Sequence, residues 1–153
     1  MTATSELSDL YQEVVLDHGK RPRNFGPLEG ATHRAEGLNP LCGDHFTVYA
    51  RMDGGVVREA RFEGSGCAIS KASASVMSSE LKGKTVEEAE RLFAVFHDLV
   101  TGKLDPATKV EEMGRLAAFA GVSEFPARVK CASLPWHTMH TALTTDQKSV
   151  STE

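Results

Sequence analysis

The sequence predicts an α+β fold, in which a small antiparallel sheet of about three strands packs against several helices. Two alternating apolar runs flank Asp53-Gly54-Gly55, which is the pattern of a β-hairpin. A helical repeat of apolar residues precedes the hairpin, and further helical repeats follow it. The chain has 153 residues, which is enough for one domain with its own core.

The first element is predicted to be an amphipathic helix over residues 5–18 that ends at Gly19. Its leucines and valines recur on one side of a helix. Residues 20–40 are rich in glycine and proline, which interrupt regular structure. This segment is therefore predicted to be mostly a loop, with at most a short strand near residues 32–35.

The hairpin is predicted from apolar residues that alternate with polar or aromatic ones over residues 46–52, and from a second run over 56–62. The sequence Gly64-Ser65-Gly66 ends the second strand. Small and apolar residues then follow at helical spacing over residues 68–81. Cys67 is therefore predicted to lie at the start of a helix.

Three more helices are predicted after residue 81. Thr85 and the glutamate three residues later form a capping-box pattern, which predicts a helix from there to about Val100. A shorter helix is predicted over residues 110–119. Pro126 is taken as the start of a turn that leads to Cys131 and to a last helix near residues 133–143.

Composition limits the function classes. We predict one domain over residues 1–143 and a polar tail without regular structure over 144–153. The net charge is −4 and the pI about 5.9, so nucleic acid is a poor candidate partner. An odd number of cysteines, no signal peptide and no long apolar run are typical of neither a secreted nor a membrane-spanning protein, and favour a reducing cytoplasm.

The three cysteines and one aspartate predict a metal site. Cys42, Cys67 and Cys131 each lie in a loop, and Asp44 follows the first of them. A helix N-terminus favours negative charge on sulfur, and Cys67 and Cys131 are both predicted to precede helices. Three thiolates and one carboxylate are a reasonable tetrahedral zinc set. The spacing lacks the paired C-x-x-C of a zinc ribbon, so spacing alone leaves the assignment open.

Each of these residues has a plainer interpretation. A single cysteine is most often a small buried hydrophobic residue, and an aspartate after glycine is ordinary turn chemistry. His137 and His140 have a spacing that suits a metal, but the same spacing is common on solvated helix faces. His18 is explained by the dipole at the end of the first helix. Packing is the preferred interpretation for Trp136.

Several segments, in this order, resemble the U-type iron–sulfur cluster assembly proteins, the family of SufU, IscU and the N-terminal part of NifU. The resemblance runs from Leu10 to Leu143. The segments that carry it are Leu16-Asp17-His18 with Pro22-Arg23-Asn24, Asn39-Pro40-Leu41-Cys42-Gly43-Asp44, Phe62-Glu63-Gly64-Ser65-Gly66-Cys67-Ala68-Ile69-Ser70 with Ala72-Ser73-Ala74-Ser75, and Lys130-Cys131.

The resemblance implies a SufE/NifU-like fold and a site at one end of it. It makes Cys42, Asp44, Cys67 and Cys131 the zinc ligands, Cys42 the acceptor of persulfide sulfur, and Arg128 a residue that assists it. It also implies a SufS-like cysteine desulfurase and downstream iron–sulfur assembly proteins as partners. If iron replaces zinc, the three cysteines would bind a transient [2Fe–2S] cluster, as on an IscU scaffold.

Two features resemble the SufU branch, whose members are described as zinc-dependent sulfur acceptors. Lys130 stands where IscU proteins carry histidine, and an extra segment lies between Thr101 and Gly121. Residues 125–130 depart from the segment by which IscU proteins engage an Hsp70-type chaperone, so that partner is not carried over. A purely structural zinc domain stays open, and so does any metal contact of Lys130 or a histidine.

Overall fold

The computed structural model describes residues 13–40, 43–103, 126–144 and 149–151, together with three single residues. The single residues, Leu116, Phe119 and Val122, are buried in the core. The named elements are β1 (His33–Asn39), β2 (Asp44–Asp53), β3 (Val56–Ser65), α2 (Ala68–Leu81), α3 (Val86–Val100), α5 (Pro126–Thr144) and β4 (Ser149–Ser151).

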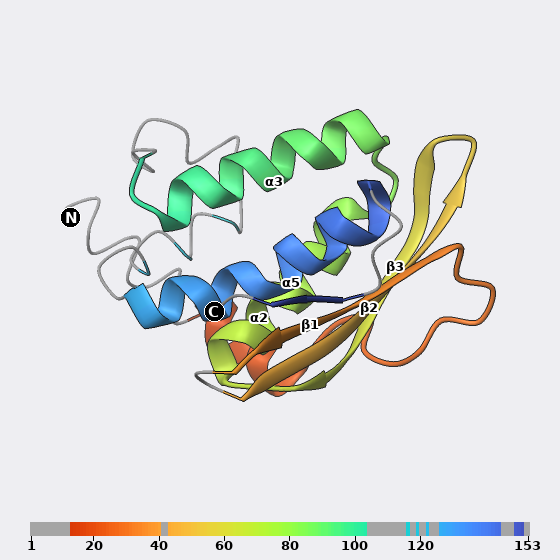
Figure 1. Cartoon of the computed structure of the whole chain (residues 1–153). Helices are drawn as coiled ribbons and strands as arrows, with labels where there is room; N and C mark the ends of the chain where they lie inside the picture. The colour runs from red at the N-terminus through yellow and green to blue at the C-terminus, as the bar shows by residue number, and fades with distance from the viewer. Residues whose placement is uncertain are drawn as a thin grey trace.

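The strands form one sheet in the order β3-β2-β1-β4 (Figure 1). β2 pairs antiparallel with β1 and with β3, which confirms the predicted antiparallel sheet of about three strands. β4 adds a short parallel pairing to β1. The tail over residues 144–153 is predicted to lack regular structure, but three of its residues form the strand β4.

The hairpin forms where its sequence predicts it. Both central residues of the turn, Gly54 and Gly55, have positive φ angles of 61° and 79°, as a tight hairpin turn requires. Phe46, Val48 and Ala50 alternate along β2 and are fully buried on the face of the sheet that the helices cover. This alternation sets which face of β2 belongs to the core.

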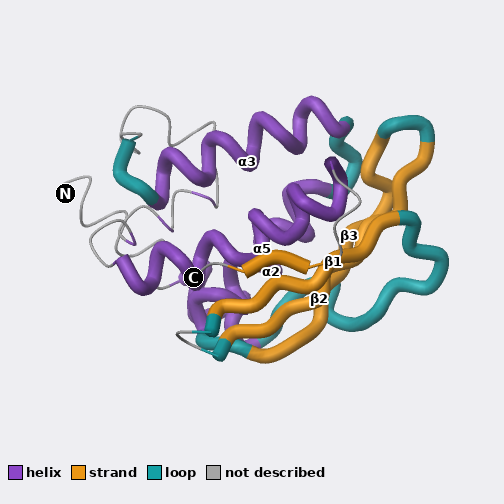
Figure 2. The backbone as a smooth tube through the Cα atoms, viewed as in Figure 1, coloured by secondary structure: helices purple, strands orange, loops and turns teal. Residues whose placement is uncertain are grey.

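The helices lie on one side of the sheet (Figure 2). α2 and α5 contact the sheet and each other, and α3 packs on α5. The ring of Phe96 from α3 stacks on Trp136 from α5 with centroids 4.5 Å apart, so packing is confirmed as the role of Trp136. The molecule thus has a sheet, a middle layer of helices and α3 outside it.

Several helix boundaries agree with the sequence. α2 spans the predicted residues, and the capping box of α3 is present, with the Glu88 amide donating to Thr85 Oγ1 and the Thr85 amide donating to Glu88 Oε1. Residues 13–20 are helical, one residue beyond the predicted stop at Gly19. Residues 5–12 and most of the predicted helix 110–119 lie outside the described residues.

The prediction for the last helix is wrong at its start. α5 begins at Pro126, seven residues before the predicted position, and Cys131 lies inside the helix instead of before it. Proline lacks an amide proton, but the first turn of a helix leaves its amides unpaired in any case, so Pro126 can open a helix as readily as a turn. β1 is also longer than the short strand predicted near residues 32–35.

In the described part of the chain, no helix combines the length and the apolar character needed to cross a bilayer.

Candidate metal centre

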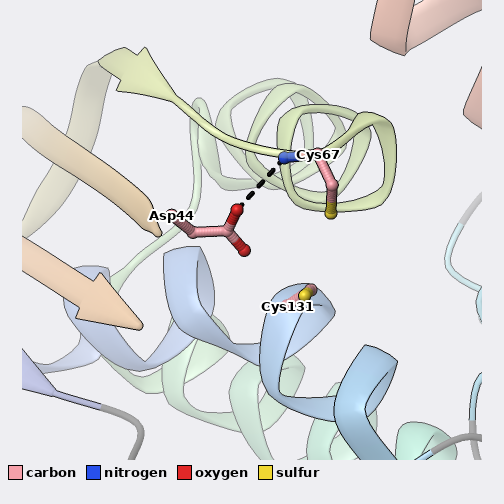
Figure 3. A group of neighbouring side chains, drawn as sticks. All are labelled: Asp44, Cys67 and Cys131. Atoms are coloured by element: carbon pink, nitrogen blue, oxygen red, sulfur yellow. Dashed lines mark hydrogen bonds between the residues drawn. The ribbon is translucent and has the colours of Figure 1, made fainter. Parts of the chain in front are cut away.

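Three predicted ligands meet at one end of the sheet. Asp44 begins β2, Cys67 is the N-cap residue of α2, and Cys131 lies in α5 (Figure 3). One carboxylate oxygen and the two sulfur atoms all lie within 4.8 Å of one another. In the segments that the structure describes, no other set of three histidine, cysteine or acidic residues converges in this way. Three elements far apart in sequence thus supply one cluster of donor atoms.

Asp44 is a buried carboxylate with one oxygen to spare. Only 1% of the surface of Asp44 is exposed to solvent. Oδ1 accepts a hydrogen bond of 3.1 Å from the Cys67 amide (Figure 3). Oδ2 is buried and, among the described residues, has no hydrogen-bond partner. A buried carboxylate oxygen without a partner is costly, and a bound cation would remove that cost.

Cys67 is held by the first turn of α2. It is exposed, its φ and ψ of −70° and 168° are those of an N-cap, and its sulfur accepts from the Ser70 amide at 3.4 Å. The predicted position of Cys67 at a helix start is confirmed. The cap directs the sulfur to the same side as Asp44, while the Cys67 amide points at the carboxylate.

Cys131 reaches the site from within α5 and is 4% exposed. It is the sixth residue of the helix, whereas the influence of a helix N-terminus on charge falls off within the first turn. The prediction that a helix N-terminus favours negative charge on the Cys131 sulfur is therefore wrong. Its sulfur takes part in the cluster because α5 packs across α2 and the sheet.

The donor set fits zinc. Donors bound to one tetrahedral zinc ion at about 2.0–2.3 Å lie about 3.5–3.8 Å apart. The observed limit of 4.8 Å therefore asks for movements of about 1 Å, which side-chain rotation can supply. Two cysteine sulfurs and a carboxylate are donor types that zinc accepts in proteins. The buried, unpartnered Oδ2 of Asp44 is the observation that favours a cation here.

Cys42, the fourth predicted ligand, lies outside the described residues. Its part in the site stays a prediction. Arg128 is exposed in the first turn of α5, three residues before Cys131, so the two residues share one side of the helix. Lys130 precedes Cys131 and is half-buried.

The histidines have other surroundings. His45 is exposed on β2. His137 and His140 on α5 line a cavity of about 340 Å³ between α3 and α5, together with His97. Partial burial and the neighbouring histidines lower the pKa of His137. His18 is buried, and its Nδ1 shares a 2.7 Å hydrogen bond with Ser75 Oγ, a contact that the dipole interpretation missed.

Gly66 leaves room for the Asp44 carboxylate. A Cβ atom at Gly66 would lie 2.5 Å from Ser70 Oγ, 2.7 Å from Asp44 Oδ1 and 2.8 Å from Phe46 Cε2. Gly66→Ala is therefore expected to displace the carboxylate, weaken zinc binding at least tenfold and destabilise the fold by about 1–3 kcal/mol.

Zinc titration and thermal unfolding test this prediction. Gly19→Ala is the matched control, because a Cβ there meets nothing closer than 3.5 Å. Equal zinc affinity for both variants would contradict the expected crowding of Asp44.

Comparison with known proteins identifies the family of this chain. Residues 10–132 match the model of the NifU-like N-terminal domain family. The chain is 42% identical over 137 residues to the zinc-dependent sulfurtransferase SufU of Bacillus subtilis strain 168, covering 89% of this chain and 90% of that protein. It is 40% identical over 141 residues to the iron–sulfur cluster assembly scaffold protein IscU of Streptococcus pyogenes serotype M1, covering 92% and 87%.

Solved structures give the same result. A crystal structure described as a SUF-system assembly scaffold of Fervidobacterium islandicum AW-1 has a TM-score of 0.80 and 37% identity, covering 89% of this chain and 98% of that one. The N-terminal part of a NifU-like protein from Brucella abortus has a TM-score of 0.76 and 26% identity, covering 90% and 94%. By the family match over most of its length and by these relatives, the chain belongs to the NifU-like N-terminal domain family, which includes SufU and IscU proteins.

Proposed function

We propose that this protein is a zinc-dependent sulfur-transfer protein of iron–sulfur cluster assembly, which accepts persulfide sulfur from a SufS-like cysteine desulfurase. The observation that carries the proposal is the convergence of Asp44, Cys67 and Cys131 around a buried carboxylate oxygen that has no partner among the described residues. The likeness to the zinc-dependent sulfurtransferase supports zinc as the metal.

In this proposal, Asp44, Cys67 and Cys131 hold the zinc ion, and Cys42 is the fourth ligand. Cys42 precedes Asp44 by two residues, and two residues of chain span at most about 7 Å. Bound zinc supplies a positive charge that keeps the ligating thiols deprotonated. Asp44 is the hardest donor of the set, and therefore the one that zinc, a borderline-soft ion, would hold least firmly.

The sulfur acceptor in this proposal is Cys42. Its thiolate attacks the outer sulfur of the desulfurase persulfide, and a new sulfur–sulfur bond forms as the donor bond breaks. The desulfurase cysteine leaves as a thiolate, and Cys42 becomes a persulfide that keeps the transferred sulfur. The exchange needs no external oxidant. Arg128 is proposed to stabilise the anionic sulfur from the exposed side of α5.

Turnover of a cysteine desulfurase tests the proposal. The zinc-loaded protein is expected to raise the turnover at least tenfold, while the zinc-stripped protein and the zinc-loaded Cys42→Ser variant are expected to raise it little. Metal content is determined on each sample. Full stimulation by Cys42→Ser would overturn the role of Cys42, and equal stimulation with and without zinc would overturn the role of the metal.

An IscU-like scaffold is the second candidate, favoured by the named scaffold relatives and by the sulfur-rich donor set. In that case the three cysteines would hold a [2Fe–2S] cluster as cargo, to be passed to downstream assembly proteins. Anaerobic addition of iron and sulfide would then produce stable charge-transfer absorbance. The reducing cytoplasm predicted from cysteine usage suits either function, because both need free thiols.

A further inference from the structure

A buried serine connects the two helices that carry the cysteines. Ser73 lies in α2 and is fully buried. Its hydroxyl donates a 2.5 Å hydrogen bond to the Ala132 carbonyl and accepts a 3.0 Å hydrogen bond from Trp136 Nε1. Both partners belong to α5, so one hydroxyl holds two points of the facing helix.

The contact lies beside the candidate metal centre. Ala132 follows Cys131 directly, and Ser73 lies in the helix that Cys67 caps. A shift of α5 along α2 would break the Ser73 bonds and would also change the distance between the two sulfur atoms. The geometry of Ser73 and that of the donor cluster are therefore linked.

The turn of α5 after Cys131 contains a proline. Pro135 has no amide proton, so it donates no hydrogen bond to the carbonyl four residues before it, and its ring crowds that turn. Trp136 Nε1 and the Ala132 carbonyl lie on either side of Pro135 in sequence, and Ser73 joins them from α2. The serine thus supports the turn from outside the helix.

The indole of Trp136, which donates to Ser73, packs against two aromatic rings. Phe96 stacks on Trp136, and Phe93 meets its ring edge-on with centroids 5.9 Å apart. Both phenylalanines belong to α3. The outer helix therefore keeps the Nε1 donor aimed at Ser73, and the position of the Cys131 turn depends on all three helices.

We propose that Ser73 is a positioning residue of the metal centre, whose hydroxyl keeps Cys131 opposite Cys67 and Asp44. This inference rests on the proposed metal function of the cluster. Ser73 touches neither metal nor sulfur in this role, and acts through Ala132 and Trp136. Loss of its hydroxyl would keep the same three donor residues, but the distances of the Cys131 sulfur from the Cys67 sulfur and from the Asp44 carboxylate would vary more.

Cobalt(II) titration of the zinc-stripped protein tests the proposal, because thiolate-to-cobalt absorption reports the ligand set independently of sulfur transfer. Ser73→Ala is expected to lower cobalt and zinc affinity by about tenfold to 100-fold and to alter the cobalt spectrum. Ser78→Ala is the matched control: Ser78 is also fully buried in α2, but its hydroxyl bonds to Ser75, Arg23 and Asn24, away from α5. The control is expected to stay within about threefold of the wild type.

Reactivity of Cys131 in the metal-free protein gives a second readout. Cys131 is buried, so a thiol reagent is expected to modify it faster in Ser73→Ala and at the wild-type rate in Ser78→Ala. If Ser73→Ala does not fold, the variant Trp136→Phe is used in its place. Phenylalanine keeps an aromatic ring in the same position but lacks the Nε1 donor. Lowered cobalt affinity in Trp136→Phe supports the proposal.

The outcomes separate the two proposals. Wild-type protein that binds cobalt without thiolate absorption would overturn the metal centre itself. Wild-type thiolate absorption with equal affinities and spectra for Ser73→Ala and Ser78→Ala would overturn only the role of Ser73. An unfolded Ser73→Ala together with unchanged affinity in Trp136→Phe would overturn it as well.

Discussion

Replacement of Asp44 by asparagine is expected to weaken zinc binding by about tenfold to 100-fold while leaving the metal-free fold at least as stable as the wild type. The carboxylate is buried, and one of its oxygens has no hydrogen-bond partner among the described residues. Without metal, a buried charge of this kind lowers the free energy of unfolding, so its removal is expected to stabilise the metal-free protein or to leave its stability unchanged. In the proposed zinc site, the same oxygen would be a ligand, and the neutral amide of asparagine would be a poorer one.

Zinc titration and chemical unfolding of the stripped and loaded proteins measure both effects. Asp53→Asn is a suitable control, because Asp53 ends the same strand and its side chain is largely exposed. That variant is expected to bind zinc as the wild type does. Zinc affinity of Asp44→Asn equal to that of the wild type would contradict the assignment of Oδ2 to a metal, whereas a loss of stability in the stripped variant would show only that the Oδ1 hydrogen bond from the Cys67 amide outweighs the cost of the buried charge.

Removal of zinc is expected to lower the unfolding temperature of the wild type by about 5–11 °C. A metal that binds only the folded state stabilises it by about 2.7 kcal/mol when its free concentration is 100 times the dissociation constant. Since β2, α2 and α5 each contribute one donor residue to the cluster, a bound zinc ion would join three elements that are distant in sequence. Loss of the metal therefore releases contacts between layers, not within one helix.

Thermal unfolding of zinc-loaded samples, with and without a chelator, tests this expectation. Cys67→Ser is the control: it lacks one of the two described sulfur donors, so the chelator is expected to change its unfolding temperature by much less. An unfolding temperature of the wild type that does not respond to the chelator, at confirmed zinc occupancy, would contradict a zinc ion bound between these elements.

Local sequence patterns predicted the elements whose boundaries are set by nearby residues. α2 follows a glycine-rich segment and carries apolar residues at helical spacing, and α3 starts at a capping box whose two hydrogen bonds lie within four residues. The hairpin turn needs positive φ angles, which its two glycines supply. Such signals depend on short-range sterics and hydrogen bonds, so they can be read without knowledge of the fold.

Other elements depended on distant partners. β1 carries little alternation of its own and forms along its full length because β2 pairs with it from Ala50 to Asp44. Three residues of the tail become β4 by pairing with β1. Pro126 suits a turn and a helix start equally well, and packing of α5 on α2 and the sheet selects the helix.

The sequence by itself determined the chemistry of the site: the sulfur and carboxylate donors, the family that they resemble and the small residues around Cys67. Only the tertiary structure decided which donors meet, that Cys131 reaches the cluster from inside α5, and that Ser73 holds the neighbouring turn. The physical reason is the distance along the chain over which each property is decided. Residue type and local backbone preference are short-range properties, whereas a distance between Asp44, Cys67 and Cys131 depends on how a sheet and two helices pack.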